Sequence, residues 1–153
     1  MRFSIKNEKL RIKNIDIDNI ENTKILPYIY NMQEVMEMSD LVVCRSGAMT
    51  ITEIATIGKP AIFIPYPFAT ENHQEYNAKV LEKVGASKII LDKELNFTKL
   101  NNMINNIVKD TETLKTMGES AKRVARADVE ENIYKEICRI VSKHETRNNL
   151  PPE

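Results

Sequence analysis

The sequence predicts an α/β fold, in which a Rossmann-like parallel sheet is flanked by helices and the carboxyl-terminal third is helical. Between Lys24 and Asp92, short apolar runs rich in β-branched residues alternate with longer segments that have helical spacing. After Asp92 the strand-like runs end and only helical spacing continues. Because parallel neighbouring strands need crossover connections, this alternation places helices over both faces of the sheet.

The predicted sheet has at least four strands, each a short apolar run. The runs are KILPYI (24–29), DLVVC (40–44), PAIFIP (60–65) and ASKIILD (86–92). Short β-branched runs separated by segments of helical spacing are typical of strands in a βαβ arrangement.

Apolar residues at three- and four-residue steps predict helices between the strands and after the last strand. The predicted helices cover residues 32–38, 48–57, 72–84, 98–108, 111–125 and 129–143. Gly58 and Gly85 are placed to end the helices before them, since glycine favours the left-handed conformation at helix ends.

Residues 25–145 are expected to form one domain, because 153 residues leave room for a single core. Residues 1–24 alternate charges and Asn with isolated Ile, which is too polar a pattern to assign to a strand or a helix. Residues 146–153 are polar and proline-containing, and they are expected to form a flexible tail.

The composition describes an ordinary globular chain without a polyanionic partner. The 22 basic and 22 acidic residues give no net charge, so nothing in the balance favours nucleic acid. Cys44 and Cys138 lie far apart without CxxC spacing, which signals neither a zinc site nor a disulfide framework and fits a reduced cytosolic compartment. No apolar stretch approaches the roughly 20 residues of a membrane-spanning helix.

The loop after the run DLVVC is the first candidate site, because open parallel sheets bind ligands outside the carboxyl ends of their strands. Ser46 is the predicted N-cap of the following helix, and Gly47 lets a ligand approach the backbone closely. The free N–H groups of the first helical turn favour phosphate. A Ser-Gly N-cap also occurs in many folds, so an ordinary capped helix is the alternative.

Glu53 lies further along the same predicted helix. At this position a carboxylate can accept two hydrogen bonds from a ribose diol, as carboxylates commonly do in nucleotide-binding folds. The alternative is an exposed glutamate that only complements the helix dipole.

Prolines, aromatics and clustered amides fill the second candidate loop and the start of its helix, residues 65–78. Amides donate and accept hydrogen bonds, so Gln74 and Asn77 suit sugar hydroxyls. The alternative is that Asn72 caps the helix while both amides lie on a solvated face. His73 is more often a surface or packing residue than a catalytic base, and the sequence supplies no acid to orient it.

The run VVCRSGAMTITEIATIGKPAIFIPYPFATENHQEYNA resembles the carboxyl-terminal domain of the MurG family. The motifs that carry the resemblance are R-S-G-A, T-x-x-E-I-A, G-K-P-A and H-Q-x-Y-N-A, and the similar region covers about residues 25–136. Members of this family transfer N-acetylglucosamine from UDP-N-acetylglucosamine to lipid I, which yields lipid II for peptidoglycan. The resemblance implies the donor-binding, carboxyl-terminal half of a GT-B glycosyltransferase.

The resemblance implies a set of donor-binding residues. They are Ile29, Ser46, Gly47, Ala48, Met49, Thr50, Glu53, His73, Gln74 and Asn77. Ile29 is implied to meet the uracil largely through its backbone, the turn 46–50 to face the diphosphate, and Glu53 to bind the ribose. Gln74 and Asn77 match the family's sugar-hydroxyl contacts, and His73 stands where some members have Gln.

The family's acceptor domain, its catalytic histidine, its membrane-docking patch and its Gly-Gly-Ser loop have no counterpart in this sequence. The chain is therefore expected to be the UDP-N-acetylglucosamine-binding half of an inverting transferase, without a catalytic residue of its own and inactive without an acceptor half. That half would supply lipid I and hold the enzyme at the cytoplasmic face of the plasma membrane. No metal is expected, because no Asp-x-Asp pair lies near the predicted diphosphate site and a helix N-terminus can stabilise the leaving group.

Two alternatives remain at the level of sequence. The chain could be the small donor-binding subunit of a two-chain UDP-N-acetylglucosamine transferase, whose partner subunit holds the acceptor. It could also be a non-catalytic fragment that binds nucleotide sugars.

Overall fold

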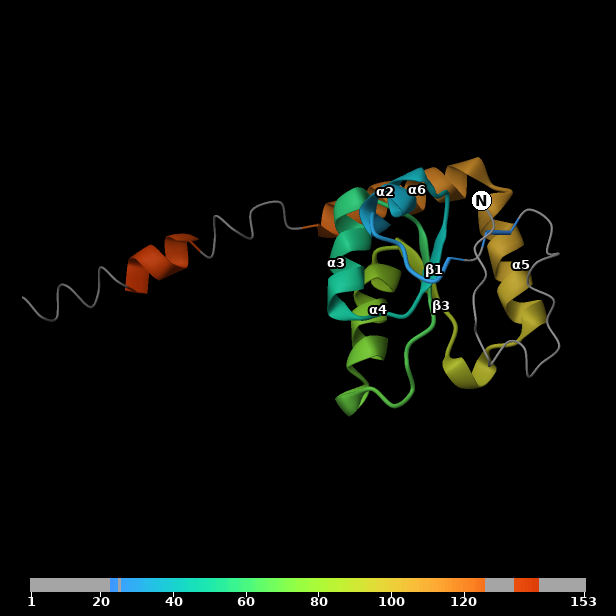
Figure 1. Cartoon of the computed structure of the whole chain (residues 1–153), viewed down its shortest axis with the longest axis horizontal. Helices are drawn as coiled ribbons and strands as arrows, with labels where there is room; N and C mark the ends of the chain where they lie inside the picture. Colours follow the sequence, from blue (N-terminus) through green and yellow to red (C-terminus); the bar gives the residue numbers. More distant parts are fainter. Residues whose placement is uncertain (1–22, 25, 126–133, 141–153) are drawn as a thin grey trace, which may run out of the picture. The chain divides into compact units, whose positions relative to one another are not determined.

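The computed structural model describes residues 23, 24, 26–125 and 134–140. The chain divides into two units, Met1–Val35 and Met36–Glu153. The named elements, in chain order, are α2 (Met32–Met38), β1 (Val42–Cys44), α3 (Ala48–Ile57), β2 (Ala61–Phe63), η2 (Thr70–Asn72), α4 (His73–Lys83), β3 (Ser87–Ile89), η3 (Asp92–Glu94), α5 (Phe97–Val108) and α6 (Thr111–Val124) (Figure 1). Residues 134–140 form a further helix.

The second unit contains a parallel sheet with the strand order β1-β2-β3. Val42 of β1 lies opposite Ala61 of β2, and Ala61 lies opposite Ser87 of β3. The connection from β1 to β2 contains α3, and the connection from β2 to β3 contains α4. The structure therefore confirms the predicted βαβ alternation and the parallel sheet.

The prediction of at least four strands is wrong for the residues that the structure describes. No strand forms at residue 24 or over 26–29, the described part of the first apolar run. Pro27 lies in the middle of this run, and proline has no N–H to donate to a neighbouring strand. The other three runs do form strands, each of three residues and shorter than its apolar run.

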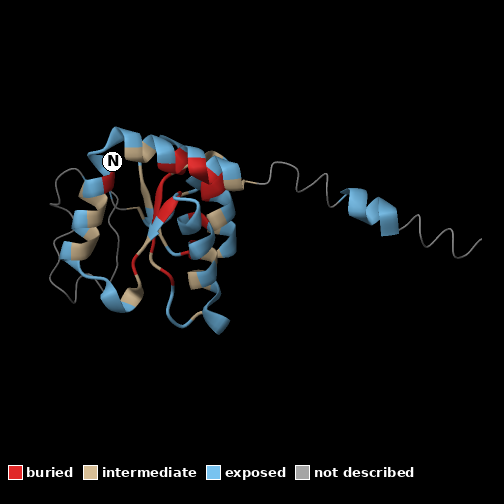
Figure 2. Ribbon diagram, turned by 180° about the vertical axis from the view of Figure 1, so that it is seen from behind, coloured by how far each residue is buried: buried red, intermediate tan, exposed pale blue. Residues whose placement is uncertain are grey.

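Alternate residues of β2 point to opposite faces of the sheet, and different helices cover the two faces. Ala61 and Phe63 belong to a buried cluster with residues of α3 and α4, whereas Ile62 clusters with Ile107 of α5. In Figure 1, α3 and α4 accordingly lie on one side of the sheet and α5 on the other. The buried residues concentrate on the sheet and on the sides of the helices that face it (Figure 2).

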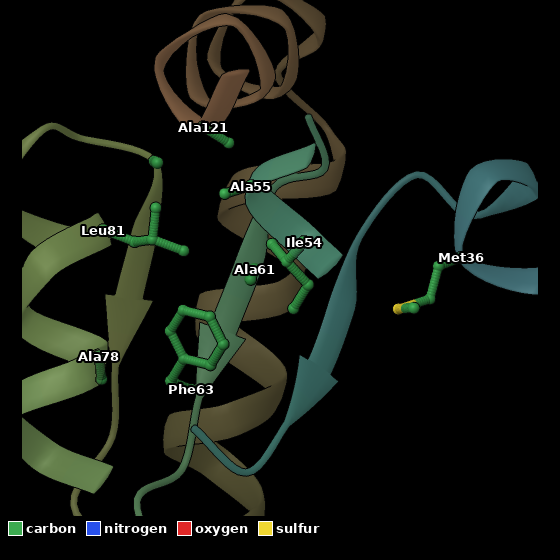
Figure 3. Close-up of a cluster of buried hydrophobic side chains, with 9 residues drawn as sticks. Met36, Ile54, Ala55, Ala61, Phe63, Ala78, Leu81 and Ala121 are labelled. Atoms are coloured by element: carbon green, nitrogen blue, oxygen red, sulfur yellow. The ribbon is translucent and has the colours of Figure 1, made fainter. Parts of the chain in front are cut away.

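The larger buried cluster fills the space between β2, α3 and α4 (Figure 3). Phe63, Ile54 and Leu81 are completely buried in it. Burying a side chain of this size stabilises the fold by about 1.5–3 kcal/mol relative to leaving it exposed. α6 takes part in both clusters, because Ala121 joins this one and Met117 joins the cluster on the other face.

Gly58 ends α3, as predicted, and lies against α6. Its φ is 69°, in the left-handed region, and its N–H donates to the carbonyl oxygens of Ile54 and Ala55 at 2.9 and 3.1 Å. A Cβ atom on Gly118 of α6 would lie only 2.7 Å from the carbonyl oxygen of Gly58. The close approach of the two helices therefore depends on the missing side chain of Gly118.

The predicted helix bounds agree with the structure to within about one residue. The bounds of α2 and α3 are those predicted, and α4 begins at His73 instead of Asn72. Of the predicted helix over 129–143, residues 134–140 are helical, and the remainder lies outside the described residues.

The first unit is described for residues 23, 24 and 26–35. Within it, the rings of Tyr28 and Tyr30 meet edge to face with their centroids 4.9 Å apart, and Ile29 between them is half-buried. The predicted segment 1–24 is described only at residues 23 and 24, and the predicted tail 146–153 lies outside the described residues. The domain boundaries at these segments stay predictions.

Candidate functional site

The loops that follow the three strands lie together, because parallel strands end at the same edge of a sheet. The backbone N–H of Ile64 donates to the oxygen of Cys44, and that of Ile90 donates to the oxygen of Phe63, each at 2.9 Å. These bonds extend the strand pairing into the loops. A pocket of about 190 Å³ opens at this edge, and its lining includes Pro65, Tyr66, Asn72, Glu75, Leu91 and Asp92.

The N-terminus of α3 opens at the same edge. The first hydrogen bond of the helix runs from the N–H of Ile51 to the oxygen of Gly47, at 3.0 Å. Helical geometry leaves the N–H groups of Ala48, Met49 and Thr50 without an acceptor inside the helix. Ala48 and Met49 are exposed, so this end of the helix presents partial positive charge to solvent.

The prediction that Ser46 caps α3 is wrong. Gly47 occupies the N-cap position in an extended conformation, and no side chain caps the helix. The Ser46 side chain is completely buried, and its hydroxyl donates to the backbone oxygen of Gln74 at 2.7 Å. That hydroxyl joins the loop after β1 to the first turn of α4, and Ser46 as a whole is buried, so its implied contact with the diphosphate stays a prediction.

Gly47 leaves the turn open. A Cβ atom placed on it would come no nearer to another side chain than 4.0 Å, the distance to the Oγ1 of Thr50. The space beside the Cα of Gly47 is thus not filled by neighbouring side chains, which leaves room for a ligand to approach the turn.

Glu53 follows on α3, in the second turn of the helix. Its side chain is exposed, and its carboxylate has no hydrogen-bond or ion-pair partner among the residues that the structure describes. The carboxylate is thus free to accept hydrogen bonds from a ligand.

The backbone takes an unusual path just before α4. Glu71 and Asn72 both have positive φ values, 50° and 56°. Such values are uncommon outside glycine and cluster at functional sites. Asn72 does occupy the N-cap position of α4, but its side chain makes no capping hydrogen bond, so the conventional cap weighed above as an alternative is absent.

Gln74 and Asn77 tie the second loop to the first. The Oε1 of Gln74 accepts the backbone N–H of Tyr66 at 3.0 Å, and the Nδ2 of Asn77 donates to the backbone oxygen of Ser46 at 3.2 Å. Among the described residues, no hydrogen bond uses the Nε2 of Gln74 or the Oδ1 of Asn77. Each side-chain amide therefore uses one polar group in a hydrogen bond within the fold, and its other polar group is available to a ligand.

His73 lies at the first position of α4, and its side chain is 63% exposed. Its Nε2 is 3.8 Å from a carboxylate oxygen of Glu71, beyond hydrogen-bond distance. The Glu71 carboxylate is itself 80% exposed. The pair therefore does not hold the imidazole in one orientation, as a catalytic base requires.

Arg45 has no role among the sequence predictions, yet its side chain contacts residues that follow both β2 and β3. Its Nη1 donates to the backbone oxygens of Ile64 and Pro65 at 3.1 and 3.0 Å, and lies 2.6 Å from the Oδ1 of Asp92. The guanidinium carbon lies 5.7 Å from the centre of the Tyr66 ring. The available signal was its place, directly after a strand and directly before the predicted phosphate turn.

Cys44, the last residue of β1, is half-buried beneath this edge. Burial raises the pKa of its thiol to about 11. The thiol is therefore neutral at physiological pH and does not act as a nucleophile there.

Ile29 belongs to the first unit, and its implied contact with uracil stays a prediction. No group of three or more His, Cys, Asp or Glu residues that could hold a metal ion occurs in the described ranges. None of the helices described between residues 23 and 140 is long and apolar enough to cross a membrane.

Comparison with known proteins identifies the family to which the chain belongs. Residues 4–133 match the model of the glycosyltransferase family 28 C-terminal domain. The chain is 45% identical over 128 residues to the UDP-N-acetylglucosamine--N-acetylmuramyl-(pentapeptide) pyrophosphoryl-undecaprenol N-acetylglucosamine transferase of Thermoanaerobacter sp. (strain X514). This match covers 84% of the chain and 35% of the relative, so the chain spans about a third of that protein's length.

Solved structures support the same fold. The crystal structure of Acinetobacter baumannii MurG is similar with a TM-score of 0.71 and 33% identity, over 76% of this chain and 35% of that one. The glycosyltransferase VinC in complex with DTDP has a TM-score of 0.67 over 87% of this chain and 32% of its own, and its 13% identity shows the fold alone. The predicted Rossmann-like half of a GT-B glycosyltransferase is confirmed, as is the resemblance to the MurG family.

Proposed function

Because the chain belongs to the glycosyltransferase family 28 C-terminal domain family, we propose that it is the UDP-N-acetylglucosamine-binding half of an inverting glycosyltransferase. The reaction of the complete enzyme adds N-acetylglucosamine to lipid I and forms lipid II in peptidoglycan synthesis. The name of the Thermoanaerobacter relative, an N-acetylglucosamine transferase acting on a pyrophosphoryl-undecaprenol, supports this donor and acceptor.

The observation that carries the proposal is the open N-terminus of α3. The free N–H groups of Ala48, Met49 and Thr50 receive the diphosphate of the donor, and Gly47 leaves room for it. The same dipole stabilises the negative charge that develops on UDP as the bond to the sugar breaks. Glu53 accepts the two ribose hydroxyls.

The sugar lies against the start of α4. The Nε2 of Gln74 donates to a sugar hydroxyl, and the Oδ1 of Asn77 accepts from one, because these are the amide groups that the fold leaves free. His73 adds a contact from the exposed side of the same turn. Ile29 meets the uracil through its backbone.

The acceptor half of the complete enzyme supplies the acceptor and the general base. Transfer requires donor, acceptor and base in one cleft, and the described residues offer only donor contacts. Lipid I reaches the site through that half, at the cytoplasmic face of the plasma membrane. No metal takes part, so the affinity for UDP-N-acetylglucosamine is expected to be the same with and without EDTA.

Titration calorimetry with UDP-N-acetylglucosamine tests the donor site. The protein is expected to bind the donor saturably, and Glu53→Ala is expected to weaken binding about ten-fold or more, because hydrogen bonds to a charged group are lost. Glu82→Ala removes another exposed glutamate, on α4, and is expected to leave the affinity unchanged. No detectable binding by the unchanged protein, or equal affinities for all three proteins, would contradict the proposed site.

A chimera separates this proposal from its alternatives. Residues 25–145 replace the corresponding domain of the Thermoanaerobacter transferase, and transfer to a lipid I analogue is measured. We expect activity in the chimera and none in the chain alone. Donor binding without transfer in the chimera would favour a non-catalytic nucleotide-sugar-binding protein. Transfer that needs a second, separately expressed subunit would favour a two-chain enzyme.

A further inference from the structure

We propose that Arg45 is a positioning residue of the donor site, which holds the loop after β2 so that Gln74 faces the sugar. The inference rests on the proposed function, since it assigns a role in binding the same donor. Arg45 is not itself a ligand of the donor in this proposal. It acts through the backbone and through Tyr66.

The contacts of Arg45 join the ends of all three strands. The residue directly follows β1, and its Nη1 bonds to the backbone oxygens of Ile64 and Pro65 after β2. The same nitrogen lies 2.6 Å from the Oδ1 of Asp92, which follows β3. One guanidinium thus sets the spacing of the loops that the donor must bridge.

The contacts continue from Arg45 to the sugar-binding amides. Its guanidinium carbon lies 5.7 Å from the centre of the Tyr66 ring, and the backbone N–H of Tyr66 donates to the Oε1 of Gln74. The backbone oxygen of Gln74 in turn accepts the hydroxyl of Ser46. A shift of the segment around Tyr66 would therefore turn the Gln74 amide away from the sugar.

The loop between Tyr66 and Gln74 needs such support. Glu71 and Asn72 hold left-handed backbone conformations, which are costly for residues with a side chain and persist only where the surroundings fix them. Arg45 fixes the first end of this loop, and the start of α4 fixes the second.

Arg45 contributes little to stability by comparison. Its side chain is 47% exposed and that of Asp92 is 35% exposed. Ion pairs this accessible to water stabilise a fold only weakly. A change at either residue should therefore be visible in donor binding rather than in thermal unfolding.

The test uses the full chain with the variants Arg45→Lys and Asp92→Asn. Lysine keeps the charge but is a shorter side chain without the planar guanidinium that lies over the Tyr66 ring. Glu94→Gln is a matched control, because Glu94 lies in the same turn, η3, and makes an equally short ion pair, 2.6 Å, with Lys99. Calorimetry measures the affinities for UDP-N-acetylglucosamine and for UDP, and thermal unfolding gives the Tm.

Both Arg45→Lys and Asp92→Asn are expected to weaken UDP-N-acetylglucosamine roughly ten-fold while changing the affinity for UDP and the Tm little. Glu94→Gln should match the unchanged protein in all three measurements. If Arg45→Lys fails to fold, Asp92→Asn still tests the ion pair, because it changes the other partner.

Unchanged affinity for UDP-N-acetylglucosamine in the two variants would overturn the inference and leave the proposed function standing. An equal loss for UDP would overturn it as well, since Arg45 would then act on the diphosphate directly. Absence of donor binding in the unchanged protein would instead reject the proposed function, and the inference with it.

Discussion

Gln74 and Asn77 show how a single amide can serve both the fold and a ligand. The fold uses the acceptor of Gln74, for the N–H of Tyr66, and the donor of Asn77, for the oxygen of Ser46. The groups left over are a donor at Gln74 and an acceptor at Asn77. Two adjacent amides of opposite free polarity suit a hydroxyl, which both accepts and donates.

Gln74→Glu tests this division of roles. Glutamate keeps an oxygen for the N–H of Tyr66 but has no N–H to donate, so the fold should persist while sugar binding is lost. We expect the affinity for UDP-N-acetylglucosamine to fall about ten-fold, with the affinity for UDP and the Tm little changed. Calorimetry with both ligands measures the difference, and equal loss for the two would argue against a sugar contact.

Cys44 gives a prediction on chemical reactivity. Its thiol pKa is raised by burial from 9.0 to about 11, so at pH 8 the fraction of reactive thiolate is about 100-fold lower than for a thiol of ordinary pKa. Alkylation by iodoacetamide should therefore be slow at Cys44 and faster at the exposed Cys138. Peptide mass spectrometry of partly labelled protein distinguishes the two, and comparable labelling of both cysteines would contradict the burial of Cys44.

At the scale of elements, the packing of α3 against α6 depends on two glycines with different duties. Gly58 supplies the left-handed turn that ends α3. Gly118 supplies space, because its missing Cβ lets the carbonyl of Gly58 approach α6. The sequence of α6 alone does not show why Gly118 must be a glycine, because the reason lies in the contact with Gly58.

Gly118→Ala is expected to destabilise the protein by about 1–3 kcal/mol, although alanine is the better helix former. Its Cβ would meet the backbone oxygen of Gly58 at 2.7 Å, and backbone cannot rotate away as a flexible side chain can. Gly47→Ala is the control, because its φ of −62° suits alanine and its Cβ would find open space. Chemical denaturation gives both free energies of unfolding, and equal values would contradict this account.

Local patterns predicted the helices better than the contacts between elements. The bounds of α2 and α3 follow from apolar spacing and a glycine stop. The role of Ser46 could not be predicted from its neighbours, since its hydroxyl donates to a backbone oxygen 28 residues away. The run at 24–29 has strand-like composition, but Pro27 within it cannot donate to a neighbouring strand.

At the scale of the whole molecule, the fold class and the place of the site could be predicted from the alternation of strands and helices. Parallel strands end at one edge, so the turn around Gly47 and the start of α4 had to lie near each other. The role of Arg45 could not be predicted, because its partners, Ile64, Pro65 and Asp92, follow other strands. The alternation places these residues at one edge, but only the structure shows that the Arg45 side chain contacts them.

α6 contributes Ala121 to the buried cluster on one face of the sheet and Met117 to the cluster on the other. A helix shared in this way couples the two faces, because its detachment would expose apolar surface on both at once. Thermal melting of the sheet and its covering helices is therefore expected to be a single cooperative event, in which neither face survives as an intermediate.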